Sequence, residues 1–590
     1  MPTNKVNITI NGRNFKVPSD YTVLRAAQEN GIYIPRLCFL KDVHEEANCR
    51  LCVVEIEGMR GLKASCKMAV YEGMVVKTDT EEIYKHVKMN LELLAANHRF
   101  DCWKCPRERN CEFLRLLQQY NVESPYNSEA YTKKQVRIDD FNESIVIDSS
   151  KCLLCGRCVS ACEKLAATGV LNFNERGSET YVGPALFHKL SDSGCIYCGK
   201  CIQACPTAAI REKDDVYNVE KVLRDESKTV VFQVAPAVRA ALGEEFGLPI
   251  GTNVEGKIYT ALKLLGVDEI LDTNFAADLT IMEEGTEFIN RIKNGGVLPM
   301  FTSCSPGWIR YVEQYYPDYL ENLSTCKSPQ QMAGAVIKHY YANKINVEKE
   351  NVVVVSVMPC VAKKFEANRE EMHFKDIRDV DYVLTTREFA RLLKNKGIDL
   401  PSLKDSKQYG LLAEYTGAGV IFGATGGVME AALRTVSEIL EEKETPIDFV
   451  EVRGVEGIKE ATYNVAGMDV NVAVVHGGAA IKEFMNILKS GEKQYHFVEF
   501  MGCTGGCVNG GGQPIVPSYV LDNVDVRAER AKVLYKIDEN SPKRKSHLNE
   551  KVMELYKELL GHPNSHTAHE LLHTTYRKRR FYHKNKSLNL

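Results

Sequence analysis

The spacing of apolar residues near the N-terminus predicts a small β-rich unit followed by helix. Residues 6–17, VNITINGRNFKV, alternate apolar and polar side chains on both sides of Asn11-Gly12, which is a strong signal for a β-hairpin. A helical pattern follows and stops near Asn30, where Gly31 is suited to end a helix. Helical spacing returns over residues 83–125.

From about Lys228 the pattern changes to short β-branched runs that alternate with helical segments. TVVFQVAP, VLPMF, VVVVSVMPC and NVAVVHG read as buried strands, whereas GKIYTALKLLG and TREFARLLKN read as helices. This alternation is typical of a large α/β domain with mostly parallel strands, in which sites gather at the carboxyl ends of the strands. Cys304, Cys360 and the segment Glu499–Pro514 follow such strands.

Length and charge exclude several classes of protein. The 590 residues are enough for several domains, and the formal net charge of −3 gives no reason to expect binding to nucleic acid or to anionic membranes. The chain has no N-terminal leader pattern and no apolar run long enough to cross a bilayer. We therefore expect a soluble, cytoplasmic protein.

The spacing of the cysteines indicates that the protein binds metal. Most of the 20 cysteines lie in short-spaced clusters, which indicates metal binding rather than disulfides in a reducing compartment. A CxxCxxCxxxC run occurs twice, and Pro206 follows the second copy. This is the pattern of a bacterial ferredoxin with two [4Fe–4S] clusters, in which the fourth cysteine of each run serves the other cluster. The predicted ligand sets are Cys152, Cys155, Cys158 and Cys205 for one cluster, and Cys195, Cys198, Cys201 and Cys162 for the other.

Two further sets of candidate metal ligands precede this run. The first, in the β-rich unit, has the order of a plant-type [2Fe–2S] ferredoxin but a longer first gap, and a zinc ribbon would need a second CxxC. The second has one imidazole and three thiols, a complete set for zinc or for one iron–sulfur cluster, and its position between iron–sulfur patterns favours the cluster. These sets are Cys38, Cys49, Cys52 and Cys66, and then His98, Cys102, Cys105 and Cys111.

The segment EFMGCTGGCVNGGGQP at Glu499–Pro514 follows a predicted buried strand. Its thiols, Cys503 and Cys507, lie beside a run of glycines, so this segment indicates either a metal site or a tight glycine loop with structural thiols. Cys326 has no short-spaced partner and is expected in the core. Glu284 and Glu287 are three residues apart on a predicted helix and share one face of it, which by itself is most often a solvated acidic face.

Taken together, these segments resemble an [FeFe]-hydrogenase over essentially the whole chain, most closely the monomeric clostridial enzymes with four accessory clusters. The C-terminal segments KRKSHLNEKVMELYKELLG and AHELLHTTY resemble the small subunit of that family. The resemblance implies four domains: a β-grasp [2Fe–2S] ferredoxin-like domain at 1–80, a small helical domain at 81–125 whose cluster has one histidine and three cysteine ligands, a two-[4Fe–4S] domain at 126–215, and a catalytic domain at 216–590 with a small-subunit-like part from about 535.

The same resemblance implies an H-cluster, a [4Fe–4S] cube joined to a diiron centre that carries CO, CN⁻ and an azadithiolate. Cys360, Cys503 and Cys507 match three cube ligands, with Cys507 as the bridge, and Lys363 matches a lysine that binds a cyanide. Otherwise Lys363 would read as a solvated lysine. The matching residues around the diiron centre are Ala235, Pro236, Gln330, Met358, Phe422 and Met501, and those of the proton relay are Arg291, Glu287, Ser324, Glu284 and the last donor Cys304.

One position departs from the family pattern. Where relatives have two adjacent cysteines, this chain has Cys304-Ser305, so the proton donor is kept and the fourth cube ligand is replaced by serine. A neutral hydroxyl is a poor ligand for iron–sulfur clusters. Three outcomes follow: serinate binds the cube, Cys304 replaces it, or another ligand does. Milder differences are Val361-Ala362 and Ala237, where relatives often carry hydroxyl groups.

The function implied is the reversible reaction 2 H⁺ + 2 e⁻ ⇌ H₂, with electrons from a ferredoxin or flavodoxin through four accessory clusters. Hydrogenase maturation proteins are expected to supply the diiron centre. The alternatives are a low-turnover sensory hydrogenase and a hydrogenase-like iron–sulfur carrier or assembly protein without that centre. A respiratory NADH dehydrogenase subunit shares the first two modules, but the Glu499–Pro514 segment argues against it.

Overall fold

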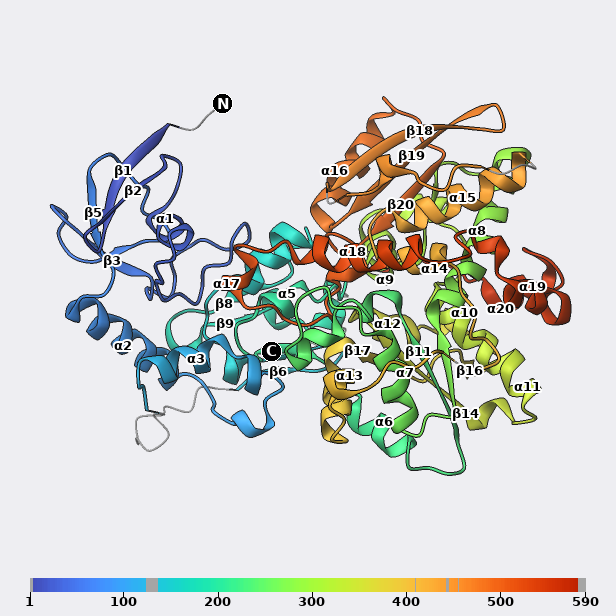
Figure 1. Ribbon diagram of the computed structural model, residues 1–590, viewed down its shortest axis with the longest axis horizontal. Helices are drawn as coiled ribbons and strands as arrows, with labels where there is room; N and C mark the ends of the chain where they lie inside the picture. Colours follow the sequence, from blue (N-terminus) through green and yellow to red (C-terminus); the bar gives the residue numbers. More distant parts are fainter. Residues whose placement is uncertain (1–3, 124–135, 409, 442–444, 455, 582–590) are drawn as a thin grey trace.

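The computed structural model describes residues 4–123, 136–408, 410–441, 445–454 and 456–581. Figure 1 shows an elongated molecule, in which the N-terminal domain lies at one end and the large α/β region at the other. The segments that carry most of the cysteines lie between them.

The N-terminal domain is built on a five-stranded sheet in the order β2-β1-β5-β3-β4. β1 (Lys5–Ile10) and β2 (Arg13–Pro18) form the predicted hairpin, because Asn11 and Gly12 both have positive φ, at 49° and 75°. β5 (Met74–Lys77) runs parallel to β1, whereas β3 (Val53–Ile56) and β4 (Lys63–Ala64) pair in antiparallel fashion. The buried face of α1 (Val23–Glu29) belongs to the same core. This is the mixed sheet with a packed helix that a β-grasp ferredoxin requires.

The helical pattern over residues 83–125 is interrupted in the structure. α2 (Glu81–Ala96) and α3 (Glu112–Gln119) are separated by two short 3-10 turns at Cys102–Lys104 and Glu108–Asn110. Pro106 lies between those turns and has no N–H to continue a helix. The expected boundary at residue 125 lies outside the described residues.

The duplicated cysteine runs lie beside a small antiparallel sheet in the order β10-β7-β6. Its strands are β6 (Ile138–Asp139), β7 (Ile145–Asp148) and β10 (Ile210–Glu212). Each run enters a short helix, α4 (Arg157–Ser160) or α5 (Lys200–Ala204), after a glycine with positive φ. The two copies therefore share one local geometry.

The large α/β region contains two four-stranded sheets, which confirms the predicted class of mostly parallel sheets. One is entirely parallel, and the other is parallel apart from its β18–β19 pair. α8 (Thr273–Asn294) contributes Leu279 to the core on one side and Ile281 to the core on the other. The strands, in sheet order, are β12 (Glu269–Asp272), β11 (Thr229–Val234), β14 (Val352–Met358) and β17 (Tyr382–Thr385), then β13 (Met300–Phe301), β20 (Phe497–Met501), β19 (Met468–His476) and β18 (Ile458–Val465).

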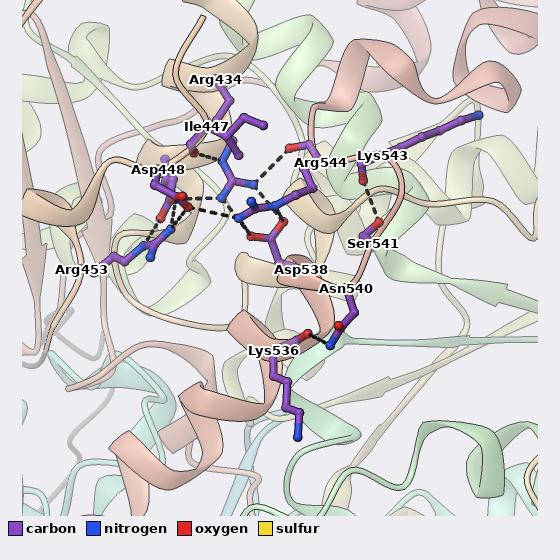
Figure 2. Close-up of polar contacts among 11 residues, drawn as sticks. Arg434, Ile447, Asp448, Arg453, Lys536, Asp538, Asn540, Ser541, Lys543 and Arg544 are labelled. Carbon is purple, nitrogen blue, oxygen red and sulfur yellow. Dashed lines mark hydrogen bonds and ion pairs between the residues drawn. The ribbon is translucent and has the colours of Figure 1, made fainter.

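The C-terminal segment crosses the catalytic region and is held there by ion pairs. α18 (Val526–Glu539) passes beside α14 (Gly417–Ile421), and its Asp538 lies between Arg434 of α15 (Gly427–Glu441) and Arg544 (Figures 1 and 2). Asp538 and Arg434 are completely buried. Among the described helices, none combines the length and the apolar character needed to cross a membrane.

Candidate metal centres and active site

The four thiols of the N-terminal domain lie together in its interior. Cys38 and Cys49 exchange contacts between backbone N–H and sulfur at 3.4 Å, and the Cys52 and Cys66 sulfurs are 3.3 Å apart. All four are less than 9% exposed. A buried set of four thiols is the donor set of a [2Fe–2S] cluster.

The second site combines one histidine with three cysteines around one cavity, which is lined by His98, Cys102, Cys105 and Cys111. Burial lowers the pKa of His98 to about 4, so its ring is neutral, as metal ligation requires. Its Nδ1 lies 3.1 Å from the Lys151 carbonyl oxygen, which leaves Nε2 free to face the cavity. The residues present therefore fit a metal cluster.

The duplicated runs enclose two cavities, and each takes its fourth cysteine from the other run. Cys205 lines one cavity with Cys152, Cys155 and Cys158. Cys162 lines the other with Cys195, Cys198 and Cys201. Burial raises the pKa of Cys155 and Cys198 to about 12, so deprotonation of these thiols has to be stabilised by bound metal.

The candidate ligand thiols of the large α/β region come from strand ends that are far apart in sequence. Cys360 follows β14, and Cys503 and Cys507 follow β20. Burial first, and then the charges of Cys503 and Cys507, raise the pKa of Cys360. Since thiols that disfavour one another's ionisation lie close together, the three form one potential ligand group.

Ser305 lies at the edge of this group. It is the N-cap of α9 (Pro306–Tyr315), and its Oγ accepts a hydrogen bond from the Gly502 N–H at 3.0 Å. Cys304 belongs to a different environment, because its side chain packs against the buried cluster that includes Phe422 and Met501. Burial and the charge of Glu284 raise the pKa of Cys304 well above its usual value. The two neighbouring side chains thus serve different parts of the site.

The residues expected around the diiron centre are all buried: Ala235, Pro236, Gln330, Met358, Phe422 and Met501. Gln330 is 1% exposed, which excludes the simple alternative of a helix-surface glutamine. Its Nε2 donates to Glu366, and its Oε1 is buried without a partner among the described residues. Lys363 Nζ donates to the same carboxylate at 2.8 Å and to the Cys304 carbonyl oxygen at 3.1 Å.

Three of the expected proton-relay residues, Arg291, Glu287 and Ser324, are joined by hydrogen bonds. Arg291 donates to Glu287 at 2.6 Å, and Ser324 Oγ donates to the other oxygen of Glu287 at 2.9 Å. A side-chain hydrogen bond with Ser324 lowers the pKa of Glu284, and the charge of Glu284 in turn raises the pKa of Cys304. Burial, followed by repulsion from Glu287, raises the pKa of Glu284 to about 8. Glu284 and Glu287 therefore do not form a solvated acidic face.

Three residues near these sites carried no signal on their own in the sequence. Glu366 holds both Lys363 and Gln330, and its position three residues after Lys363 on a helix could have indicated this pairing. The Glu499 carboxylate accepts from the backbone N–H groups of Gly426 and Met429, which fixes β20 against α15. His573 gave no signal because its partners lie far away in the sequence and come close only in the folded chain.

His573 comes from the C-terminal segment and lies behind the relay. Its ring nitrogens lie 3.1 Å from a Glu283 oxygen and 2.8 Å from Thr325 Oγ1. Donor atoms of His573, Glu287 and Cys326 lie within 4.8 Å of one another. Cys326 is completely buried, as expected for a core residue, although its thiol also contacts Glu287.

The glycine run at 510–512 packs against protein backbone. A Cβ at Gly510 would lie 2.2 Å from the Pro359 carbonyl oxygen, and one at Gly511 would lie 2.3 Å from that of Cys198. Gly511 therefore allows the catalytic segment to touch the loop of the second ferredoxin-like run. The glycines bring the ligand-bearing segments together.

Sixteen candidate ligands in four groups, together with a further buried thiol group beside hydrogen-bonded acidic residues, are the features of an iron–sulfur redox enzyme. Comparisons with known proteins identify the particular family. Residues 228–511 match the family described as "Iron only hydrogenase large subunit, C-terminal domain", and residues 524–579 match "Iron hydrogenase small subunit". The chain belongs to the iron-only, or [FeFe]-, hydrogenases, and it is a hydrogenase with accessory iron–sulfur domains.

The N-terminal modules match as well. Residues 3–81 match a 2Fe-2S cluster binding domain, 88–125 an iron–sulfur binding region of NADH-ubiquinone oxidoreductase G, and 151–209 a 4Fe-4S dicluster domain. Iron hydrogenase 1 of Clostridium pasteurianum is 45% identical over 97% of this chain and 100% of that protein. A solved variant of [FeFe]-hydrogenase HydA1 from Chlamydomonas reinhardtii superposes with a TM-score of 0.56 at 38% identity, over 62% of this chain and 99% of that one. Protein NAR1 of Arabidopsis thaliana is 32% identical but matches only 59% of this chain and 78% of its own length.

Proposed function

We propose that this hydrogenase carries one [2Fe–2S] cluster, three accessory [4Fe–4S] clusters and an H-cluster. The support is the grouping of donor side chains into four accessory sets and a fifth group at Cys360, Cys503 and Cys507. The domains would follow these sites, at 1–80, 81–125, 126–215 and 216–590. When bound, the H-cluster supplies the exchange of electrons between protons and H₂.

The hydrogen bonds that join Arg291, Glu287 and Ser324, and the buried Glu284 beyond them, support the proton-transfer part of this proposal. Glu287 would accept protons on the Arg291 side, and the Ser324 hydroxyl would pass them to Glu284. Because the pKa of Glu284 is about 8, its carboxyl group holds a proton at neutral pH and can donate it towards the Cys304 thiol. Lys363 would present its ammonium to an anionic ligand of the diiron centre.

Partners follow from the same proposal. A soluble ferredoxin or flavodoxin would deliver electrons to the accessory clusters, and maturation proteins would insert the diiron centre. All 20 cysteines are free thiols, which agrees with a cytoplasmic location and with assembly in a reducing compartment.

The test is co-production with hydrogenase maturation proteins, followed by infrared spectroscopy and a hydrogen-evolution assay with reduced ferredoxin. We expect bands of metal-bound CO and CN⁻ together with rapid H₂ production. Bands with very slow turnover would indicate a sensory hydrogenase. If the CO and CN⁻ bands and H₂ production are both missing in protein that retains its cubane iron, the chain is a carrier or assembly protein and the proposal is refuted.

A further inference from the structure

A buried lysine lies at the junction between the second ferredoxin-like run and the catalytic segment. Lys200 is in the motif CIYCGKCIQACP, between the candidate ligands Cys198 and Cys201, and is 4% exposed. Its Nζ donates to Gln203 Oε1 at 2.9 Å and to the Asn509 carbonyl oxygen at 2.7 Å. Asn509 lies two residues after Cys507. Lys200 thus connects the two ligand-bearing loops.

The junction itself is tight. Gly199 and Gly511 lie in backbone contact, since a Cβ on Gly199 would be 2.9 Å from the Gly511 Cα. Gln203 Nε2 donates to the Gly510 carbonyl oxygen at 2.8 Å. One cation at this position is therefore close to candidate ligands of both sites.

Lys200 has no carboxylate partner within ion-pair distance among the described residues. The neighbouring cations differ in this respect, because Arg527 pairs with Asp525 at 3.0 Å and Arg530 with Glu244 at 2.6 Å. Lys200 lies between the candidate ligands Cys198 and Cys201, and its contact with Asn509 places it two residues from the candidate ligand Cys507. A buried ammonium group is costly unless an anion faces it.

We propose that Lys200 is a shared counter-cation for the cluster at Cys162, Cys195, Cys198 and Cys201 and for the cube at Cys360, Cys503 and Cys507, and that it raises the reduction potential of both. This rests on the ligand sets proposed above. Each site takes up one electron, [4Fe–4S]²⁺ + e⁻ → [4Fe–4S]⁺, and a fixed positive charge stabilises the more negative product. Lys200 acts as a positioning and tuning residue that never binds substrate.

The experiment is a redox titration with dithionite, followed by EPR, on full-length protein made without maturation proteins. Lys200→Gln is compared with Lys200→Arg, which keeps the charge, and with Lys482→Gln, which removes an exposed lysine and changes net charge equally. We expect two of the five proposed reduction steps to move to more negative potential in Lys200→Gln. The reduction potentials of both controls, Lys200→Arg and Lys482→Gln, should stay close to those of the parent protein.

Gln203→Glu is a second test variant, and it leaves Lys200 in place. It adds a carboxylate where Oε1 now lies 2.9 Å from Nζ, so the same two steps should move in the same direction, even if Lys200→Gln loses iron. Unchanged potentials in both variants, equal shifts of all five steps, or an equal shift in Lys200→Arg would overturn the proposal. Because the diiron centre is absent from these samples, a failure of hydrogenase activity leaves this result unaffected.

Discussion

At the scale of single residues, Glu284 gives the catalytic site a pH limit. Its pKa of about 8 means that the proposed relay loses its proton donor as pH rises through 8. We expect hydrogen evolution with reduced methyl viologen to fall across that range. Glu284→Gln should lower the rate about 100-fold or more at every pH, because general acid–base groups contribute on that scale, and the step near pH 8 should disappear.

Stability gives an independent check on the same residue. Folded Glu284 keeps its proton up to about pH 8, whereas an ordinary glutamate releases it near 4.5, so its contribution makes the fold less stable as pH rises between those values. Glu284→Gln should remove that loss. The exposed Glu348→Gln is the control; an unchanged pH profile in Glu284→Gln would contradict the assignment.

We expect Ser305 to determine the stability and the EPR signal of the proposed cube. Its Oγ already accepts the Gly502 N–H, and a hydroxyl is a weaker ligand for iron than a thiolate. We expect Ser305→Cys to change the EPR signal of the cube and to improve iron retention during dilution under mild oxidation. Ser305→Ala is the control and should show neither gain. Identical EPR signals and iron contents in parent and Ser305→Cys would show that Ser305 is not at the cube.

Residues were predictable where spacing alone specifies chemistry. The short gaps between cysteines predict ligands because neighbouring thiols must reach one metal centre. Glu499 and His573 escape such reasoning, because each acts through partners that only the folded chain brings close, whereas Glu366 lies three residues after its partner Lys363. Lys363 and the relay residues were predicted through the family resemblance; without it, Lys363 and the pair Glu284 and Glu287 suggested solvated positions.

At the scale of elements, Asp538 fixes α18 to α15. Arg434 donates to both of its carboxylate oxygens at 2.9 Å, and Arg544 donates to the same group (Figure 2). Asp538→Asn would leave the fully buried Arg434 with Glu430, at 2.8 Å, as its remaining carboxylate partner, so the loss should fall below the about 3–5 kcal/mol of a buried charge left unpaired. Denaturant unfolding of the catalytic region measures the loss.

The pH dependence of this contact has a defined sign. The arginines hold the pKa of Asp538 below its usual 3.8, although burial opposes them. The stabilisation is therefore complete above pH 3.8 and is lost as pH falls through the lower folded value. Asp448→Asn is the matched control, since its side chain is 53% exposed and should cost less than about 1 kcal/mol. Equal losses in the two variants would contradict the role given to Asp538.

Gly511 tests the contact between two elements directly. Gly511→Ala places a Cβ 2.3 Å from the Cys198 carbonyl oxygen and 2.7 Å from the Gly199 Cα, so the two ligand loops must separate. We expect a lower iron content per chain and a lower melting temperature. Gly307→Ala is the control at a neighbouring buried site, where the nearest atom would be 3.6 Å away. A variant at position 511 with full iron content would show that the loops tolerate separation.

Elements were predicted best where the pattern is local. The hairpin at Asn11-Gly12 and helices such as α7 (Glu255–Leu264) and α13 (Thr386–Asn395) agree with the sequence. VLPMF gave only the two-residue strand β13, because Pro299 has no N–H for the sheet. The helix expected across residues 83–125 is broken where the second ligand set needs an irregular loop.

At the scale of the whole molecule, one aspartate ties the N-terminal domain to the remainder. Asp522 accepts from Arg36 and from Gln28 at 2.9 Å, and its carbonyl oxygen accepts from Lys41 at 3.2 Å. Arg36 and Asp522 are both nearly buried, at 5% and 8%. Asp522→Ala should therefore weaken this attachment by about 3 kcal/mol or more.

Hydrogen exchange of residues 4–80 and small-angle scattering measure that attachment. We expect faster exchange at the interface and a larger radius of gyration for Asp522→Ala. Lys41→Met, which removes only one bond to a carbonyl oxygen from an exposed side chain, should change neither. An unchanged radius in Asp522→Ala would mean that other contacts hold the domain. Such contacts join residues almost 500 positions apart and could not be read from local pattern.

The meeting of the C-terminal segment with the relay has a consequence for biosynthesis. His573 pairs with Cys326 as an isolated bridge, and its ring reaches Glu283 and Thr325. A ribosome delivers His573 only after more than 240 residues have followed Thr325. The surroundings of the proposed relay are therefore completed only after residue 573 has been made, and a chain that stops before it, even one already loaded with iron and sulfide, would lack them.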